Sequence, residues 1–130
     1  MNVVVDTSIW IDFFKGKPLP ELDEALRGGI VYLTPVIAAE LISGVSSKLE
    51  ETELFEFLHH LPVVDCPFLH WIAVGKLRGK CRKLGLTVST PDAHIAQAAL
   101  DIHGTLFTKD QIFAKIAQHI GLKSNTHFRE

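Results

Sequence analysis

The sequence predicts an α/β protein in which a mainly parallel sheet is covered by helices. Short apolar or β-branched runs, beginning with Val3-Val4-Val5, alternate along the chain with longer segments of helical periodicity. The first run shows no polar alternation, which is typical of a parallel strand that is buried on both faces. Ligands of such sheets bind beyond the carboxyl ends of the strands, so a functional site is expected there.

The first half of the chain is expected to alternate between helices and strands. Apolar spacing predicts a helix at residues 8–14 and a shorter helix at residues 22–26. Residues 30–33 follow as the second strand. Thr34-Pro35 then opens another helix, because Thr is a favourable N-cap and Pro is tolerated at the first helical position.

The second half of the chain continues this alternation. Thr90-Pro91 repeats the capping signal and opens a helix that Gly104 is expected to end. Apolar spacing predicts further helices at residues 54–61, 69–84 and 112–120, a candidate strand at residues 63–64, and a strand at residues 106–107.

Composition predicts a single domain, residues 1–130, in a soluble cytoplasmic protein. A chain of 130 residues that is 47% hydrophobic is long enough to bury one core. Thirteen basic and 15 acidic residues give a net charge of −2, which argues against a protein that coats polyanions. Cys66 and Cys81 form no C-x-x-C pair and are expected to be reduced. The sequence shows neither a signal peptide nor a membrane span.

Four acidic residues are positioned to converge. Asp6 follows the first strand, Asp92 lies in the first turn after Thr90, and Asp110 follows the last strand. Glu40 lies within an apolar stretch of the helix after the second strand. An Asp at a helix N-terminus is also a common partner of the helix dipole, so position alone leaves both roles open for Asp92 and Asp110.

A cluster of four carboxylates requires compensation. Two unit charges at about 4 Å and an effective dielectric constant near 20 repel by about 4 kcal/mol. Several such pairs would rival the whole stability of a domain, unless some acids protonate or a divalent cation neutralises them. Ligands that are all oxygen suit Mg²⁺ or Mn²⁺, and such an ion can activate water for attack on a phosphodiester.

At these residues the chain resembles the PIN-domain ribonucleases, and among them the VapC-type toxins of toxin–antitoxin pairs. The resemblance covers essentially the whole chain and rests on four acidic motifs in order, Val3-Val4-Val5-Asp6-Thr7-Ser8, Glu40-Leu41-Ile42-Ser43-Gly44, Pro91-Asp92-Ala93-His94-Ile95-Ala96 and Leu106-Phe107-Thr108-Lys109-Asp110. Many relatives carry a further acid two residues after the fourth, where this chain has Ile112. That difference puts a second metal ion in doubt more than the first.

The resemblance implies a three-layer α/β/α sandwich with a mainly parallel central sheet, and Mg²⁺- or Mn²⁺-dependent endoribonuclease activity. It implies that Asp6, Glu40, Asp92 and Asp110 hold the metal ion. Ser8 would help to place a metal-bound water, and Thr108 would support the site from behind. It also implies a cognate antitoxin and a homodimer.

Basic residues suggest where RNA would bind. Lys76, Lys80 and Lys83 share one face of the predicted helix at residues 69–84, where they either contact phosphates or simply face solvent. Lys109 stands beside Asp110 and is better placed to meet a scissile phosphate.

The helix at residues 8–14 is apolar almost all round, so a partner protein is expected to cover part of it. Trp10 and Phe14 lie four residues apart and would form a ridge, which we expect to dock the antitoxin. Asp12 is expected to be a solvated charge. The seven histidines show no H-E-x-x-H, H-x-H or Cys/His grouping, and we interpret them as ordinary surface or core residues.

Three other functions compete with the nuclease. A dehalogenase-type phosphatase needs a second Asp two residues after the first, where this chain has Ser8. A phospho-accepting receiver domain could use Asp65 and Lys109, but it requires paired acids after the first strand and gives no role to Glu40. A non-catalytic PIN-like module that binds RNA or protein is the closest alternative, although all four acids are present.

Overall fold

The computed structural model describes residues 1–125, which form seven helices and four strands. In chain order the elements are β1 (Val3–Val5), α1 (Thr7–Phe14), α2 (Pro20–Arg27), β2 (Val31–Tyr32), α3 (Pro35–Ser43), α4 (Lys48–His59), α5 (Phe68–Lys83), α6 (Thr90–Asp101), β3 (Thr105–Phe107), α7 (Gln111–Ala117) and β4 (Lys123–Asn125).

The four strands form one parallel sheet in the order β2-β1-β3-β4. Val3, Val4 and Val5 of β1 pair with Thr105, Leu106 and Phe107 of β3, so these central strands end side by side. The backbones approach closely where this pairing starts. Thr105 N–H donates to the Asn2 carbonyl, and a Cβ on Gly104 would lie 2.6 Å from that oxygen. Only a residue without a side chain therefore fits at position 104, where the turn after α6 ends and β3 begins.

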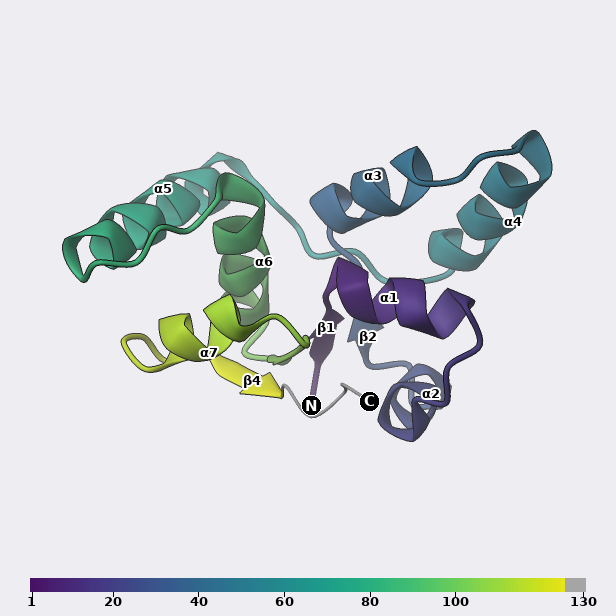
Figure 1. Cartoon of the computed structure of the whole chain (residues 1–130), viewed down its shortest axis with the longest axis horizontal. Coiled ribbons are helices and arrows are strands. Elements are labelled where there is room, and N and C mark those ends of the chain that lie inside the picture. Colours follow the sequence, from purple (N-terminus) through teal and green to yellow (C-terminus); the bar gives the residue numbers. More distant parts are fainter. Residues whose placement is uncertain (126–130) are drawn as a thin grey trace.

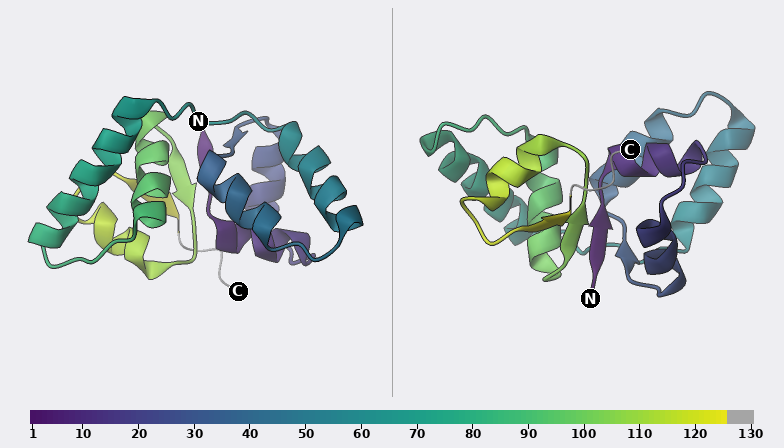
Figure 2. Two further views of the ribbon diagram at one scale, coloured as in Figure 1. Left: turned by 90° about the horizontal axis from the view of Figure 1, so that it is seen from above. Right: turned by 60° about the horizontal axis from the view of Figure 1, so that its bottom comes forward.

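Helices flank the sheet as two groups, α1–α4 on one side and α5–α7 on the other (Figures 1 and 2). The core lies where these layers meet: every residue of β1 is buried, and Ile9, Ile37, Ile95 and Ile116 bring four helices onto it. The α/β/α arrangement expected from the sequence is thus confirmed.

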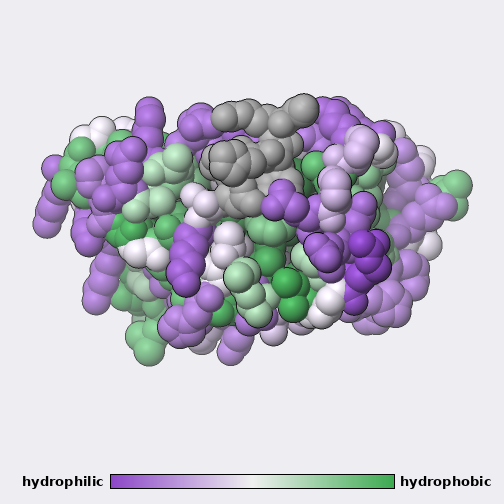
Figure 3. Space-filling model, turned by 90° about the horizontal axis from the view of Figure 1, so that it is seen from below, coloured by the Kyte–Doolittle hydropathy of each residue, from purple (hydrophilic) through white to green (hydrophobic). Residues whose placement is uncertain are grey.

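On the face viewed in Figure 3, hydrophilic side chains cover most of the surface and hydrophobic ones form small groups between them. None of the helices within residues 1–125 combines the length and the apolar character that crossing a bilayer requires.

The structure corrects several expected boundaries. The N-cap of α6 is Ser89, whose hydroxyl accepts from Asp92 N–H, so Thr90 is the first helical residue and not the cap. The second strand is two residues long, and residues 63–64 make only an isolated bridge to Leu33. The last helix ends at Ala117. The polar strand β4 was not expected at all.

The histidines are not all ordinary. His70 and His94 are buried, their rings hydrogen-bond to each other, and Cys66 lies beside them. Burial lowers the pKa of His94 to about 4, so its ring is neutral at physiological pH. Cys66 and His70 are four residues apart in the sequence, and His94 joins them from another helix, so the expectation of no Cys/His grouping is wrong in three dimensions.

Candidate functional site

Asp6 is fixed at the junction between β1 and α1. As the N-cap of α1 it accepts a hydrogen bond from Thr7 N–H at 2.8 Å on Oδ1. Its other oxygen accepts from the Thr108 hydroxyl at 2.7 Å and, more weakly, from Ser8 at 3.4 Å. Both oxygens are thus oriented before any ligand binds, and the side chain is 7% exposed.

The segment after β3 supplies the second group. The fully buried hydroxyl of Thr108 donates to Asp6 Oδ2 and accepts from Asp110 N–H at 3.0 Å, so one side chain ties the two strand ends together. Asp110 is the N-cap of α7, where its Oδ1 accepts from Ile112 N–H. The support expected of Thr108 would act through these two contacts.

Glu40 reaches the same place from α3. Its Oε1 accepts a hydrogen bond of 2.6 Å from the hydroxyl of Thr7, the residue that follows Asp6. This contact orients Glu40 toward the β1 edge, although the residue itself is exposed. Thr7 was not singled out from the sequence, because its reach to Glu40 depends on how α1 and α3 pack.

The four acids line one open hollow of about 600 Å³ at the carboxyl edge of the sheet. Its lining residues are Asp6, Thr7, Ser8, Ile11, Glu40, Asp92, Ile95, Lys109 and Asp110. The convergence expected from strand ends is therefore present in the structure, with Ser8 beside the carboxylates.

Burial and mutual repulsion shape the electrostatics of this hollow. Desolvation raises the pKa of Asp6 above its usual 3.8, and the negative charges of Asp92 and Asp110 raise it further. Hydrogen bonds from Thr108 and Thr7 lower this pKa but do not cancel the increase. Desolvation also raises the pKa of Asp92, as do the charges of Asp110 and Glu40. A cation in the hollow would relieve this repulsion.

The ammonium group of Lys109, which lines the hollow, is already paired with a carboxylate. Lys109 Nζ donates to Asp12 Oδ2 at 2.6 Å, while Lys17 lies 3.2 Å from the other oxygen. Asp12 is buried, so the expectation of a solvated charge is wrong, and the Lys109 hydrogen bond, followed by that of Lys17, lowers its pKa. An ammonium has three donors, so Lys109 keeps others for a phosphate.

The remaining basic residues lie elsewhere. Lys76, Lys80 and Lys83 are exposed on α5 and are not among the residues that line the hollow. An RNA contact by these three residues stays a prediction. Asp65, the phospho-acceptor of the receiver interpretation, is likewise absent from the lining, whereas Lys109 belongs to it.

Of the two aromatic residues expected to dock a partner, only Phe14 is exposed. Trp10 is completely buried, and its ring packs against Phe13, Phe14 and Phe57, so its assignment as a partner contact is wrong. The reason is that α4 supplies Phe57 and covers this side of α1. Phe14 stacks on Trp10 as expected and remains 44% exposed.

Comparisons with known proteins find relatives that match along most of the chain. The family model of the PIN domain matches residues 3–118. Ribonuclease VapC1 of Methanocaldococcus jannaschii is 30% identical over 128 residues, which cover 94% of this chain and 85% of that protein.

Several solved structures share the fold. One is VapBC2 of Rickettsia felis bound to a DNA fragment from its promoter, with a TM-score of 0.78, 21% identity, and coverage of 96% of this chain and 98% of the other. DNA-bound VapBC of Salmonella typhimurium also gives 0.78, with 22% identity and coverage of 96% and 97%. With a family match over nearly the whole chain and the four acids at one edge of the sheet, this protein belongs to the PIN-domain family.

Proposed function

We propose that this chain is a divalent-metal-dependent endoribonuclease and the toxin of a toxin–antitoxin pair, acting as one domain. The observation that supports the activity most is the convergence of Asp6, Glu40, Asp92 and Asp110 on one open hollow. The name of the relative Ribonuclease VapC1 points to RNA as the substrate.

The donor chemistry of the hollow fits Mg²⁺ or Mn²⁺. Four carboxylates and the Ser8 hydroxyl offer oxygen ligands alone, whereas neither cysteine is among its lining residues. Asp6, Asp92, Asp110 and Glu40 would hold the ion. When bound, it would polarise the phosphoryl group and lower the pKa of a water.

The protein's own residues prepare the site for hydrolysis. Thr108 and Thr7 fix the orientation of Asp6 and Glu40 before substrate arrives, so little reorganisation is needed. Lys109 can donate to a phosphate oxygen with the ammonium hydrogens that Asp12 leaves free. Among residues 1–125, none that lines the hollow is a His, Tyr or Cys nucleophile. We therefore infer direct attack by water, which leaves a 5′-phosphate and a 3′-hydroxyl.

The test is cleavage of mixed RNA with Mg²⁺, with Mn²⁺ and with EDTA. Asp6→Asn and Asp92→Asn should each abolish cleavage, whereas Asp65→Asn, a change in an exposed acid outside the hollow, should not. Cleavage that continues undiminished in EDTA would refute metal dependence. Phosphorylation of Asp65 by acetyl phosphate, without RNA cleavage, would favour the receiver function instead.

The antitoxin proposal rests on a second hollow beside the first. It has a volume of about 560 Å³, and its lining combines apolar residues of α1, α3 and α4, namely Ile11, Phe14, Leu41 and Leu54, with charged residues such as Glu50 and Glu53. Ile11 and Glu40 line both hollows, so an apolar segment lying here would run up to the acids. Phe14 is its exposed aromatic anchor. The homodimer would use another surface.

Phe14→Ala tests this site; it removes the ring that stacks on Trp10 but leaves the contacts of Trp10 with Phe13 and Phe57 in place. We expect retained RNA cleavage and weaker inhibition by the co-encoded protein. Phe55→Ala, which removes an aromatic of similar exposure outside this hollow, is the matched control. Equal inhibition of both variants and the unmodified protein would contradict the assignment.

A further inference from the structure

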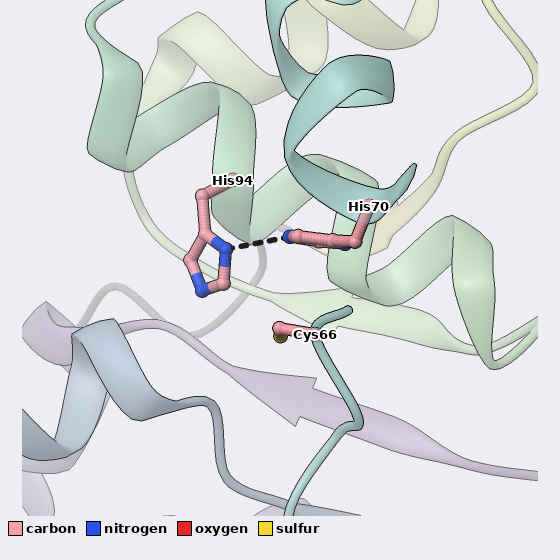
Figure 4. Close-up of side chains that lie close together, drawn as sticks. All are labelled: Cys66, His70 and His94. Carbon is pink, nitrogen blue, oxygen red and sulfur yellow. Dashed lines mark hydrogen bonds between the residues drawn. The ribbon is translucent and has the colours of Figure 1, made fainter. Parts of the chain in front are cut away.

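A second group of metal-binding side chains lies apart from the acidic hollow. Cys66 lies in the loop before α5, His70 in the first turn of α5, and His94 on α6 (Figure 4). One ligand atom from each lies within 4.8 Å of the other two. Both histidines are buried and the cysteine is half-buried. None of the three lines the acidic hollow.

The two imidazoles face each other. Nε2 of His70 lies 2.8 Å from Nδ1 of His94, and the rings are nearly perpendicular. On its far side, Nδ1 of His70 lies 2.6 Å from Oδ2 of Asp101. A carboxylate only accepts, so Nδ1 carries the proton and Nε2 presents a lone pair to the cluster. A carboxylate behind a histidine is the usual outer-shell arrangement at zinc sites.

We propose that Cys66, His70 and His94 form a binding site for a thiophilic transition-metal ion such as Zn²⁺, with Asp101 orienting His70. The ligands would be Cys66 Sγ, His70 Nε2 and His94 Nδ1. Sulfur and imidazole donors select Zn²⁺ over Mg²⁺, so this site and the carboxylate hollow would bind different ions.

The distances require only small adjustments. With Zn–N near 2.05 Å and Zn–S near 2.3 Å, tetrahedral ligands lie about 3.3–3.6 Å apart. The two ring nitrogens, now 2.8 Å apart, would separate by about half an ångström, and the sulfur would move inward from a distance of at most 4.8 Å. Cys66 is in a loop and its thiol, a weak donor, makes a 3.4 Å hydrogen bond to Val64 O, so it is the ligand that moves.

Proton positions follow from the same geometry. In the metal-free protein, His94 Nδ1–H donates to His70 Nε2, and the buried Nε2 of His94 has no partner within the described part of the chain. On binding, Nδ1 presents its lone pair, the ring proton moves to Nε2, and the thiol releases its proton. Desolvation and nearby acids raise the pKa of Cys66, so the thiolate forms only when a cation compensates its charge.

The ion would join the segment that contains Cys66 and His70 to a helix more than 20 residues further along the chain. It would pin the loop before α5 to α6, the helix that carries Asp92 in its first turn. Trp71 stacks on the His94 ring at 4.7 Å between centroids and limits its movement. An ion that binds the folded protein and not the unfolded chain would raise the melting temperature.

Co²⁺ is the probe that separates this site from the acidic hollow. A cysteine ligand gives a thiolate-to-cobalt charge-transfer band, which oxygen ligands cannot produce. We expect one equivalent of Co²⁺ to give this band together with the visible absorption of tetrahedral cobalt, and excess Zn²⁺ to remove both. Absence of the band in the unmodified protein overturns the proposal, whatever any variant does.

Variants identify the ligands. Cys66→Ser can keep the hydrogen bond to Val64 and should lose the band, whereas Cys81→Ser, a change in the other cysteine, should keep it. Asp92→Asn should also keep it, because the hollow contributes no sulfur. A band that survives Cys66→Ser refutes the assignment.

Asp101→Asn tests the positioning role. It preserves the shape of the side chain but weakens the hydrogen bond that orients His70, and should lower Zn²⁺ affinity about 10- to 100-fold. Asp65→Asn, an acid in the loop beside Cys66, is the control for simple loss of charge. Equal Zn²⁺ affinities in the two variants would show that Asp101 does not orient a ligand.

Discussion

Thr108 offers the sharpest test of how the acidic site is supported. Its hydroxyl is completely buried, donates to Asp6 at 2.7 Å and accepts from Asp110 N–H at 3.0 Å. Thr108→Val keeps the shape of the side chain and removes both hydrogen bonds. Asp6 then loses a donor that stabilises its charged form, so its raised pKa rises further.

The magnitude follows from these two contacts. A hydrogen bond to a charged group contributes about 1.5–3 kcal/mol and an ordinary one about 1 kcal/mol, so the variant should lose about 2–4 kcal/mol in the free energy of unfolding. At roughly 4 °C per kcal/mol for a chain of this size, the melting temperature should fall by about 8–16 °C. Metal affinity should fall about 10- to 100-fold, because Asp6 is no longer oriented.

Thermal unfolding at pH 8 and Mn²⁺ titration measure the two effects. Thr105→Val is the matched control, because Thr105 lies three residues earlier, at the start of β3, and within the described residues its hydroxyl makes only a 3.9 Å contact with a Met sulfur. Thr108→Ser should restore much of the metal affinity. If Thr108→Val and Thr105→Val behave alike in both assays, Thr108 does not support the site.

Three other predictions concern charge. Asp92→Asn should raise the melting temperature of the metal-free protein at neutral pH, because it removes a carboxylate that the folded state disfavours; a large decrease would instead indicate a structural cap. Because the pKa values of Asp6 and Asp92 are raised in the folded state, the metal-free protein should become more stable as the pH falls from neutral toward 3.8. Saturating Mg²⁺ should reverse this trend. Urea unfolding at several pH values measures both effects. Replacing Lys80 and Lys83 with Gln should weaken RNA binding and flatten its dependence on salt, and an unchanged slope would mean that they only face solvent.

Local patterns predicted the elements that carry the acids. The run Val3–Val5 followed by Asp6 marks a buried strand and its carboxyl end, and this junction appears in the structure as expected. Thr34-Pro35 likewise gives the observed cap of α3, since the Thr34 hydroxyl accepts from Ile37 N–H. Such signals work because strand burial and helix capping depend on residues near in sequence.

Features that depend on contacts between residues far apart in the sequence were not predicted. The sequence suggests that Trp10 is an interface anchor, but in the structure Phe57 of α4 packs against it. The sequence also suggests that Asp12 is a surface charge, but Lys109, which is distant in sequence, donates a hydrogen bond to it. Strand β4 has no apolar pattern, because it is an edge strand defined by its pairing with β3. The Cys66–His94 proximity likewise arises only when α5 and α6 pack together.

Direct Mn²⁺ binding, followed by electron paramagnetic resonance, tests most directly whether the four carboxylates form one metal site. Titration of the metal-stripped protein should show binding that Asp92→Asn weakens at least about tenfold and that Mg²⁺ displaces, while Asp65→Asn binds like the unmodified protein. If Asp92→Asn binds Mn²⁺ as tightly as the unmodified protein, the acids in this hollow do not act together as a metal site.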